Sequence, residues 1–202
     1  MKLYYSPGAC SLSPHIALKE SGLAFEAIAA PTKTHQLADG TDYYTINPLG
    51  YVPFLVLDDG RTLHEGPAIV QYIADQVPAK QLAPANGSWE RYKLQEWLNT
   101  IGTELHKGFS PLFTPGMPEE AKTLAKTRLI SRLTWVDGEL AGKNYLLGDT
   151  FTVADSYLFV VAGWSKHVGL DLSGLSHLGA FMARVGARPA VQEALRAEGL
   201  IK

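Results

Sequence analysis

The only cysteine of this 202-residue chain, Cys10, lies where a thiol would be chemically activated. Residues 2–5 (KLYY) have the composition of a short buried strand, and residues 6–8 (SPG) supply a turn before a helix that begins near Cys10. A helix N-terminus presents unpaired N–H groups and the positive end of the dipole, which favour a thiolate. On composition alone a lone cysteine is more often a small buried hydrophobe, and no second cysteine completes a C-x-x-C pair.

Two further segments could hold a ligand beside such a thiol. Val52 precedes Pro53, where a trans peptide bond is the base-rate expectation, whereas a cis bond would turn the Val52 N–H and C=O outward to pair with an extended peptide. Glu65 and Gly66 precede a helix in which Pro67 suits the first turn. That helix start could hold a carboxylate while Glu65 accepts from an ammonium group, and the simpler interpretation is a solvated acid that favours the dipole.

A polar stripe follows the long helical pattern that begins at Ser88. Asn99, Thr103, His106 and Ser110 recur at i, i+4, i+7 and i+11, opposite apolar positions. This stripe is either a solvated face or the wall of a cleft. The six histidines of the chain show no metal-ligand spacing, so no metal site is expected.

Strands and helices alternate in the N-terminal segment that must position these groups. Residues 25–29 alternate apolar and polar after the first strand and helix, which predicts a parallel β-α-β crossover. Apolar residues 54–57 and the short run 62–64 flank a hairpin turn at residues 58–60 (DDG). The pattern predicts an α/β unit with a mixed sheet.

Strand signals vanish after a Pro- and Ala-rich segment at residues 78–87. The remainder shows helical periodicity only, at residues 88–110, 119–140, 152–164, 175–185 and 190–197. The predicted organisation is therefore an α/β domain at residues 1–77, a linker at 78–87 and an all-α domain at 88–202.

Composition restricts the class of protein. The chain is 46% hydrophobic and 19% charged, as expected for a globular protein with a real core, and its net charge of −2 argues against nucleic acid or an anionic membrane as a partner. No apolar run of roughly 18 residues is present to span a membrane. Because the first predicted strand begins at residue 2, no signal peptide is expected, and the lone cysteine predicts a reducing, cytoplasmic setting.

The whole combination resembles the cytosolic glutathione S-transferases, and within them the bacterial beta class. The resemblance covers essentially the whole chain and implies a thioredoxin-like N-terminal domain followed by an all-α domain. The residues that carry it are Gly8-Ala9-Cys10-Ser11, Asn47-Pro48, Val52-Pro53, Glu65 to Ile69, Tyr72, Glu104 to Lys107 and Thr152 to Asp155.

The resemblance also implies the chemistry. Glutathione would be a co-substrate, with no permanently bound cofactor, and a homodimer would conjugate it to hydrophobic electrophiles in a detoxification or catabolic role. Thiol–disulfide exchange or peroxide reduction through Cys10 would be side activities. One alternative is an enzyme of the same fold in which glutathione-dependent thiol exchange, peroxide reduction, isomerisation or dehalogenation is the main reaction. The other alternative is a non-catalytic binding or regulatory protein of the same fold.

Site residues follow from the same resemblance. Cys10 and His106 would be catalytic, and the implied glutathione-binding residues are Cys10, His35, Val52, Glu65, Gly66, Asn99, Thr103, Glu104, Leu105 and His106. Two positions depart from the beta-class pattern. His35 replaces a lysine expected to bind the glycyl carboxylate, and Gly66 lacks a hydroxyl, so only its backbone N–H can serve.

Overall fold

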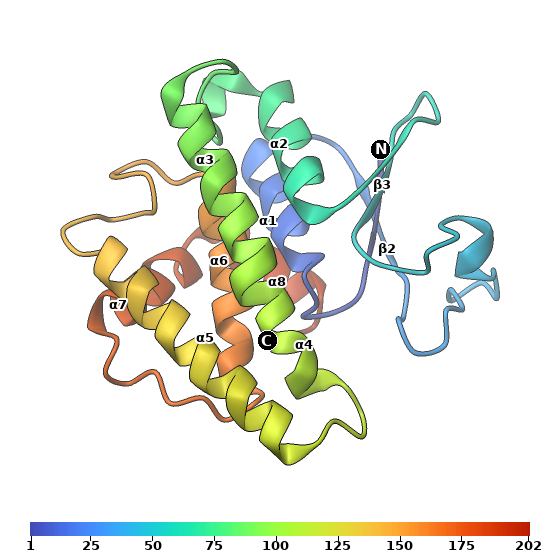
Figure 1. Ribbon diagram of the computed structural model, residues 1–202. Coiled ribbons are helices and arrows are strands. Elements are labelled where there is room, and N and C mark those ends of the chain that lie inside the picture. Colours follow the sequence, from blue (N-terminus) through green and yellow to red (C-terminus); the bar gives the residue numbers. More distant parts are fainter. The chain divides into compact units, whose positions relative to one another are not determined.

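The N-terminal sheet forms from the segments that the apolar patterns predict. In the computed structural model, which describes residues 1–202, the strands are β1 (Lys2–Tyr5), β2 (Glu26–Ala29), β3 (Phe54–Val56) and β4 (Thr62–His64), in the order β2-β1-β3-β4 (Figure 1). β1 pairs with β2 in parallel and with β3 antiparallel, and β3 pairs antiparallel with β4. The predicted mixed sheet of thioredoxin-like topology is confirmed.

Two helices of this unit begin and end at the predicted signals. α1 (Leu12–Ser21) has Pro14 in its first turn, and Gly22 ends it at φ 75° with its N–H donated to the carbonyl of Leu18. α2 (Gly66–Gln76) has Pro67 in its first turn and buries one apolar face. The two helices pack against each other.

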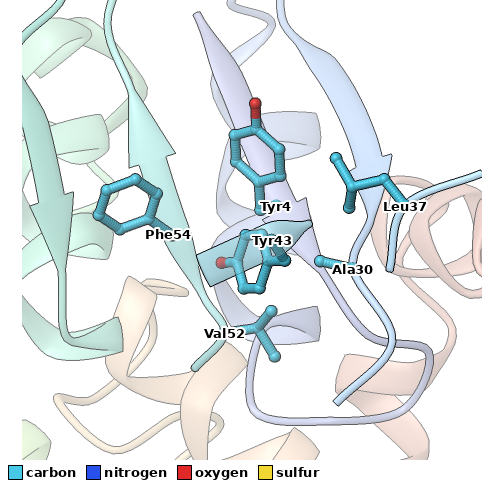
Figure 2. Packing of buried hydrophobic residues seen from close by; sticks show 6 residues of the cluster. All are labelled: Tyr4, Ala30, Leu37, Tyr43, Val52 and Phe54. Carbon is cyan, nitrogen blue, oxygen red and sulfur yellow. The ribbon is translucent and has the colours of Figure 1, made fainter. Parts of the chain in front are cut away.

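The long connection between β2 and β3 is anchored by an apolar cluster. Figure 2 shows the side chains that converge there from this connection and from the strands: Tyr4, Ala30, Leu37, Tyr43, Val52 and Phe54. The 3₁₀ turn η1 (Tyr43–Thr45) supplies Tyr43, whose side chain is fully buried. The cluster fixes an otherwise irregular loop, including the backbone around Val52.

The second unit, residues 84–186, is entirely helical. Its segments are α3 (Trp89–Thr100), the π-helical η3 (Ile101–His106), α4 (Lys107–Phe113), α5 (Glu119–Glu139), α6 (Val153–Gly163), the 3₁₀ turn η4 (Trp164–Lys166) and α7 (Ser176–Gly186). No helix combines the length and the apolar composition that crossing a membrane requires.

The helix predicted at residues 88–110 differs from the observed one in two ways. It changes to π-helical hydrogen bonding at η3, and it continues through Pro111 to Phe113 rather than ending before the proline. Gly108 marks a close approach of this helix to α5, because a Cβ there would lie 2.9 Å from a methyl carbon of Leu129.

α6 is capped as its sequence predicts. The carboxylate of Asp155 accepts hydrogen bonds from the N–H and the hydroxyl of Thr152, at 2.7 and 2.9 Å, and from the N–H of Leu146 at 2.8 Å. The helix is buried on almost every side, in agreement with its apolar sequence.

The C-terminal helix packs differently from the expected domain division. α8 (Pro189–Ala197) and the residues after it form one compact unit with residues 1–83, whereas the sequence pattern placed all of residues 88–202 in the all-α domain. The reason is specific contact with α1, where Arg188 donates to both carboxylate oxygens of Glu20 at 2.6 and 3.0 Å. The expected linker holds the 3₁₀ turn η2 (Pro78–Lys80) and the boundary between the two units, after residue 83.

Candidate functional site

Cys10 lies two residues before the first helical residue of α1 and is partly exposed. Its Sγ donates to the carbonyl oxygen of Val52 at 3.3 Å, and its own carbonyl accepts from the N–H of Ser13 at 3.1 Å. The peptide bond between Val52 and Pro53 is cis. The structure therefore brings together the thiol and the backbone segment that the sequence marked as a peptide-pairing edge.

The turn that carries Cys10 is braced internally by Ser11. Ser11 Oγ accepts from the Ser6 N–H at 3.0 Å and donates to the Ser6 carbonyl at 3.2 Å. The Ala9 N–H also bonds the Ser6 carbonyl, at 3.1 Å. These bonds close the strand-to-helix turn, so that the position of Cys10 is set by the backbone around it.

Two side chains that the sequence interpretation missed support the Val52 edge. The hydroxyl of Tyr43 and the side-chain amide of Asn47 both donate to the carbonyl of Tyr51, each at 2.8 Å. Burial raises the pKa of Tyr43 to about 12, so its hydroxyl remains a donor at neutral pH. Nothing in the sequence paired Tyr43 with the segment that precedes Pro53.

Glu65 and Gly66 form the start of α2 beside this edge. Glu65 has φ 69°, and its exposed carboxylate makes no capping bond to the helix. The N–H of Gly66 is the first of the helix and lies outside the intrahelical bonding pattern. A Cβ placed on Gly66 would lie 3.9 Å from the ring of Pro53, so the helix start adjoins the cis bond and has room for a small side chain.

His35 lies in the loop after β2 with φ 52°. Its ring contacts Tyr44 at 4.5 Å between centroids, and its Nδ1 is buried without a hydrogen-bond partner. A ligand could therefore reach only the Nε2 edge of this imidazole.

The residues of the helical unit that were expected to bind glutathione differ in exposure and in hydrogen bonding. Asn99 and Thr103 are exposed, and the Thr103 hydroxyl donates to the Asn99 carbonyl at 3.0 Å. Leu105 is fully buried, so its side chain is part of the core. Glu104 accepts from two arginines of α5, Arg128 at 2.9 Å and Arg132 at 2.8 Å, which lowers the pKa of its carboxyl group.

His106 is held by a partner that the sequence interpretation missed. Its Nδ1 lies 2.7 Å from the hydroxyl of Tyr157 on α6, and its ring meets Trp164 edge-on with 5.0 Å between centroids. Burial, with a smaller contribution from the charge of Lys107, lowers the pKa of His106 to about 4. The imidazole is therefore neutral at pH 7 and can donate or accept one hydrogen bond, but it carries no charge.

The π-helical hydrogen bonding of η3 explains why His106 leaves the predicted polar stripe. Bonds from i to i+5 rotate each following residue relative to an α-helix, so a spacing of i, i+4 and i+7 no longer describes one face. Single π-helical turns occur often at functional sites. Nowhere do three His, Cys, Asp or Glu side chains gather as metal ligands would.

Comparisons with known proteins agree with this arrangement. Residues 8–76 match the family model "Glutathione S-transferase, N-terminal domain", and residues 92–189 match "Glutathione S-transferase, C-terminal domain". Glutathione S-transferase GstA of Escherichia coli O157:H7 is 51% identical over 200 residues, which cover 99% of this chain and 100% of the relative.

Two solved structures are also similar to this chain in backbone fold. A sphingomonad glutathione S-transferase complexed with glutathione is 50% identical, with a TM-score of 0.96 and full coverage of both chains. A bacterial beta-class glutathione S-transferase from Sphingomonas chungbukensis is 52% identical, with the same TM-score and coverage.

Proposed function

Because the chain belongs to the bacterial beta class of the glutathione S-transferases, we propose that it transfers the glutathione thiolate to hydrophobic electrophiles. The observation that carries the proposal is the distance of 3.3 Å between Cys10 Sγ and the Val52 carbonyl, next to a cis peptide bond. A peptide paired with Val52 would place its own thiol beside Cys10.

Glutathione would extend from the Val52 backbone to the start of α2 at Gly66. The Val52 backbone would pair with its cysteinyl residue. The γ-glutamyl end would be held at the start of α2, with its carboxylate on the Gly66 N–H and its ammonium group on the Glu65 carboxylate. The Nε2 edge of His35 would meet the glycyl carboxylate. The exposed, uncapped Glu65 carboxylate supports this assignment.

The reaction needs glutathione as a thiolate. The thiol would lose its proton to solvent, and the thiolate would form a bond to the electrophilic carbon while the leaving group departs with its electron pair. Cys10 would stabilise the thiolate by donating a hydrogen bond and would not act as a general base. Each unit by which the bound thiol's pKa falls reflects about 1.4 kcal/mol of thiolate stabilisation.

The helical unit would complete the site in a homodimer. His106 would act as a neutral hydrogen-bonding group, and Asn99 and Thr103 would offer exposed polar groups. Glu104 would contribute through its backbone, because two arginines already bind its carboxylate. Leu105 would also contribute through its backbone, because its side chain is buried. The electrophile would lie on the exposed ring of Phe113, which meets Trp164 edge-on at 5.9 Å, while the fully buried Phe109 packs edge-on against Trp164 at 5.7 Å.

Thiol–disulfide exchange and peroxide reduction are proposed as side activities. Cys10 is partly exposed and lies at a helix start, so its thiolate can attack a substrate disulfide that carries glutathione, which releases the substrate thiol and leaves glutathione on Cys10. With a peroxide, the thiolate is oxidised to a sulfenic acid as the O–O bond breaks, and glutathione then condenses with the sulfenic acid to give the same mixed disulfide and water. The chain holds no second cysteine, so a second glutathione thiol would have to resolve that disulfide.

Conjugation of glutathione to chlorodinitrobenzene tests the proposal. The wild type is expected to turn over, and Glu65→Gln is expected to lower kcat/KM for glutathione by about tenfold or more, because the ammonium group loses a charged partner. Glu26→Gln, which changes an exposed acid of the same unit, is the control and should leave the rate unchanged. Absence of turnover with every electrophile tested would instead favour a binding or regulatory role.

A further inference from the structure

Glu198 is a buried acid that the proposed reaction does not use. It directly follows α8, and neither its side chain nor that of His15 on α1 is accessible, with exposed fractions of 0% and 1%. Its Oε2 accepts from the N–H of Gly8 at 2.9 Å, and its Oε1 lies 2.8 Å from His15 Nδ1. A buried carboxylate needs such partners, because an unpaired one would be strongly destabilising.

The two groups that Glu198 joins lie on either side of Cys10 in the chain. Gly8 precedes Cys10 by two residues, in the turn, and has φ 71°. His15 follows it by five residues, in α1. One carboxylate therefore ties the turn and the helix together around the thiol, from a position 190 residues away from Gly8 in the sequence.

The chain after Glu198 covers the same turn. The Leu200 N–H bonds the Leu195 carbonyl at 2.9 Å, which folds the terminal segment back on α8. A Cβ on Gly8 would then lie 3.5 Å from a methyl carbon of Leu200. The turn thus has an apolar contact beside its hydrogen bond.

Aromatic rings shield the pair from water. The His15 ring lies 5.5 Å from the rings of both Tyr5 and Phe25. Burial raises the pKa of Tyr5, and the negative charge of Glu198 raises it further. In such surroundings a hydrogen bond to a carboxylate is strong and well directed.

We propose that Glu198 is a positioning residue that sets the reactivity of Cys10. By holding the Gly8 N–H, it keeps the turn in the conformation in which Cys10 Sγ lies against the Val52 carbonyl. The inference rests on the proposed function only in that Cys10 takes part in the reaction. The positioning itself involves no glutathione.

A second contact between the same elements provides a matched control. Glu20 lies in the last turn of α1, at the end of the helix away from Cys10, and binds Arg188 just before α8. Losing this ion pair weakens the docking of α8 on α1 without releasing Gly8. The two glutamates therefore separate positioning of the thiol from general stability.

The test is the rate at which iodoacetamide alkylates Cys10 in the folded protein without glutathione, measured by mass spectrometry below the unfolding temperature of every variant. Glu198→Ala is expected to react about fivefold faster, since the partly buried thiol is no longer held on Val52. Glu198→Gln should stay within about twofold of the wild type, because its amide oxygen still accepts from Gly8. Glu20→Ala should also stay within about twofold.

Wild-type reactivity of Glu198→Ala would overturn the proposal, and so would equal acceleration in Glu198→Ala and Glu20→Ala. If Glu198→Ala does not fold, Glu198→Asp serves instead, because it keeps the charge but shortens the reach to Gly8. Its alkylation should be about threefold faster, and an unchanged rate would contradict the inference. Because glutathione is absent, failed glutathione binding would overturn the proposed function and leave this result standing.

Discussion

At the scale of single residues, Cys10 would have a different role in each of the two proposed reactions. In conjugation, Cys10 would stabilise the glutathione thiolate by donating a hydrogen bond and would itself remain unchanged. In thiol–disulfide exchange, the Cys10 sulfur would be the nucleophile. The 3.3 Å bond from Cys10 to Val52 shows that its thiol can act as a donor in this position.

Cys10→Ala is therefore expected to abolish glutathione-dependent thiol transfer and to lower conjugation much less, by about tenfold at most. Initial rates with a mixed-disulfide substrate and with chlorodinitrobenzene measure the two. Cys10→Ser, which keeps a donor, should restore conjugation but not thiol transfer. Equal and total loss of both activities in Cys10→Ala would contradict this division.

The lowered pKa of His106 predicts that the stability of the protein depends on pH. Its pKa is about 4 in the folded protein and about 6.5 when unfolded, so the unfolded state binds more protons between these values. Its contribution is present above pH 6.5 and is lost as the pH falls to 4. With about 1.4 kcal/mol per unit, the loss approaches about 3 kcal/mol.

Urea unfolding of the wild type and of His106→Phe at pH 7 and pH 4.5 measures this contribution. The variant should lose less stability on acidification than the wild type, and His167→Gln, at an exposed position, should behave as the wild type. Burial raises the pKa of Asp155 to about 6 and acts in the opposite sense, so the difference between variants is the decisive quantity. An identical pH response in His106→Phe and the wild type would contradict the burial of a neutral His106.

At the scale of elements, the irregular loop between β2 and β3 depends on one glycine. Gly50 has φ 65°, and a Cβ there would lie 2.6 Å from the ring of Tyr44 and 3.0 Å from His35 Nδ1. Gly40 in the same loop has φ 85° and nothing within 4 Å. The two glycines share the cost of a positive φ but not the clash.

Gly40→Ala is expected to cost about 1 kcal/mol through its backbone conformation, and Gly50→Ala about 2–4 kcal/mol because the aromatic ring must move as well. Urea unfolding measures both. Gly50→Ala should also weaken glutathione binding through His35, whereas Gly40→Ala should not. Equal losses of unfolding free energy in the two variants would show that the Tyr44 ring moves aside at no cost, which would contradict this prediction.

The N-terminal cap of α6 depends on the carboxylate of Asp155. Asp155→Ala leaves the buried N–H groups of Leu146 and Thr152 without an acceptor, which is expected to cost about 3–5 kcal/mol of unfolding free energy. The control is Asp149→Ala, which removes an exposed bond to Asn144 and should cost less than about 1 kcal/mol. Thermal unfolding of both variants checks this, and similar losses would contradict the assignment.

The sequence predicts elements well where the signal is local. Strand bounds at β1 and β4, the stop at Gly22 and the cap at Thr152 follow from side chains within a few residues of each feature. The π-helical turn was not predictable, because no side chain marks a change from i+4 to i+5 bonding. Pro111 was assumed to end a helix that in fact continues to Phe113.

Contacts between segments that are distant in the sequence could not be predicted from local sequence patterns. The periodicity of α8 marks a helix but not the surface against which it packs, so its place beside α1 was missed. The same holds for Glu198 on Gly8 and for Tyr157 on His106, which are 190 and 51 residues apart. Resemblance to a family supplied residues that could touch glutathione, but not the side chains that hold those residues in place.

At the scale of the whole molecule, the account depends on glutathione binding by the intact, reduced chain. The site residues assigned to this binding come from the thioredoxin-like unit and the helical unit alike. His35 and Gly66 depart from the beta-class pattern at two of the expected contacts, so the affinity for glutathione tests the proposed contacts.

Calorimetric titration of reduced glutathione into the reduced protein tests this claim most directly. The account predicts saturable binding near one site per chain, weakened about tenfold or more in Glu65→Gln and unchanged in Glu26→Gln. No heat of binding at millimolar glutathione would contradict the account.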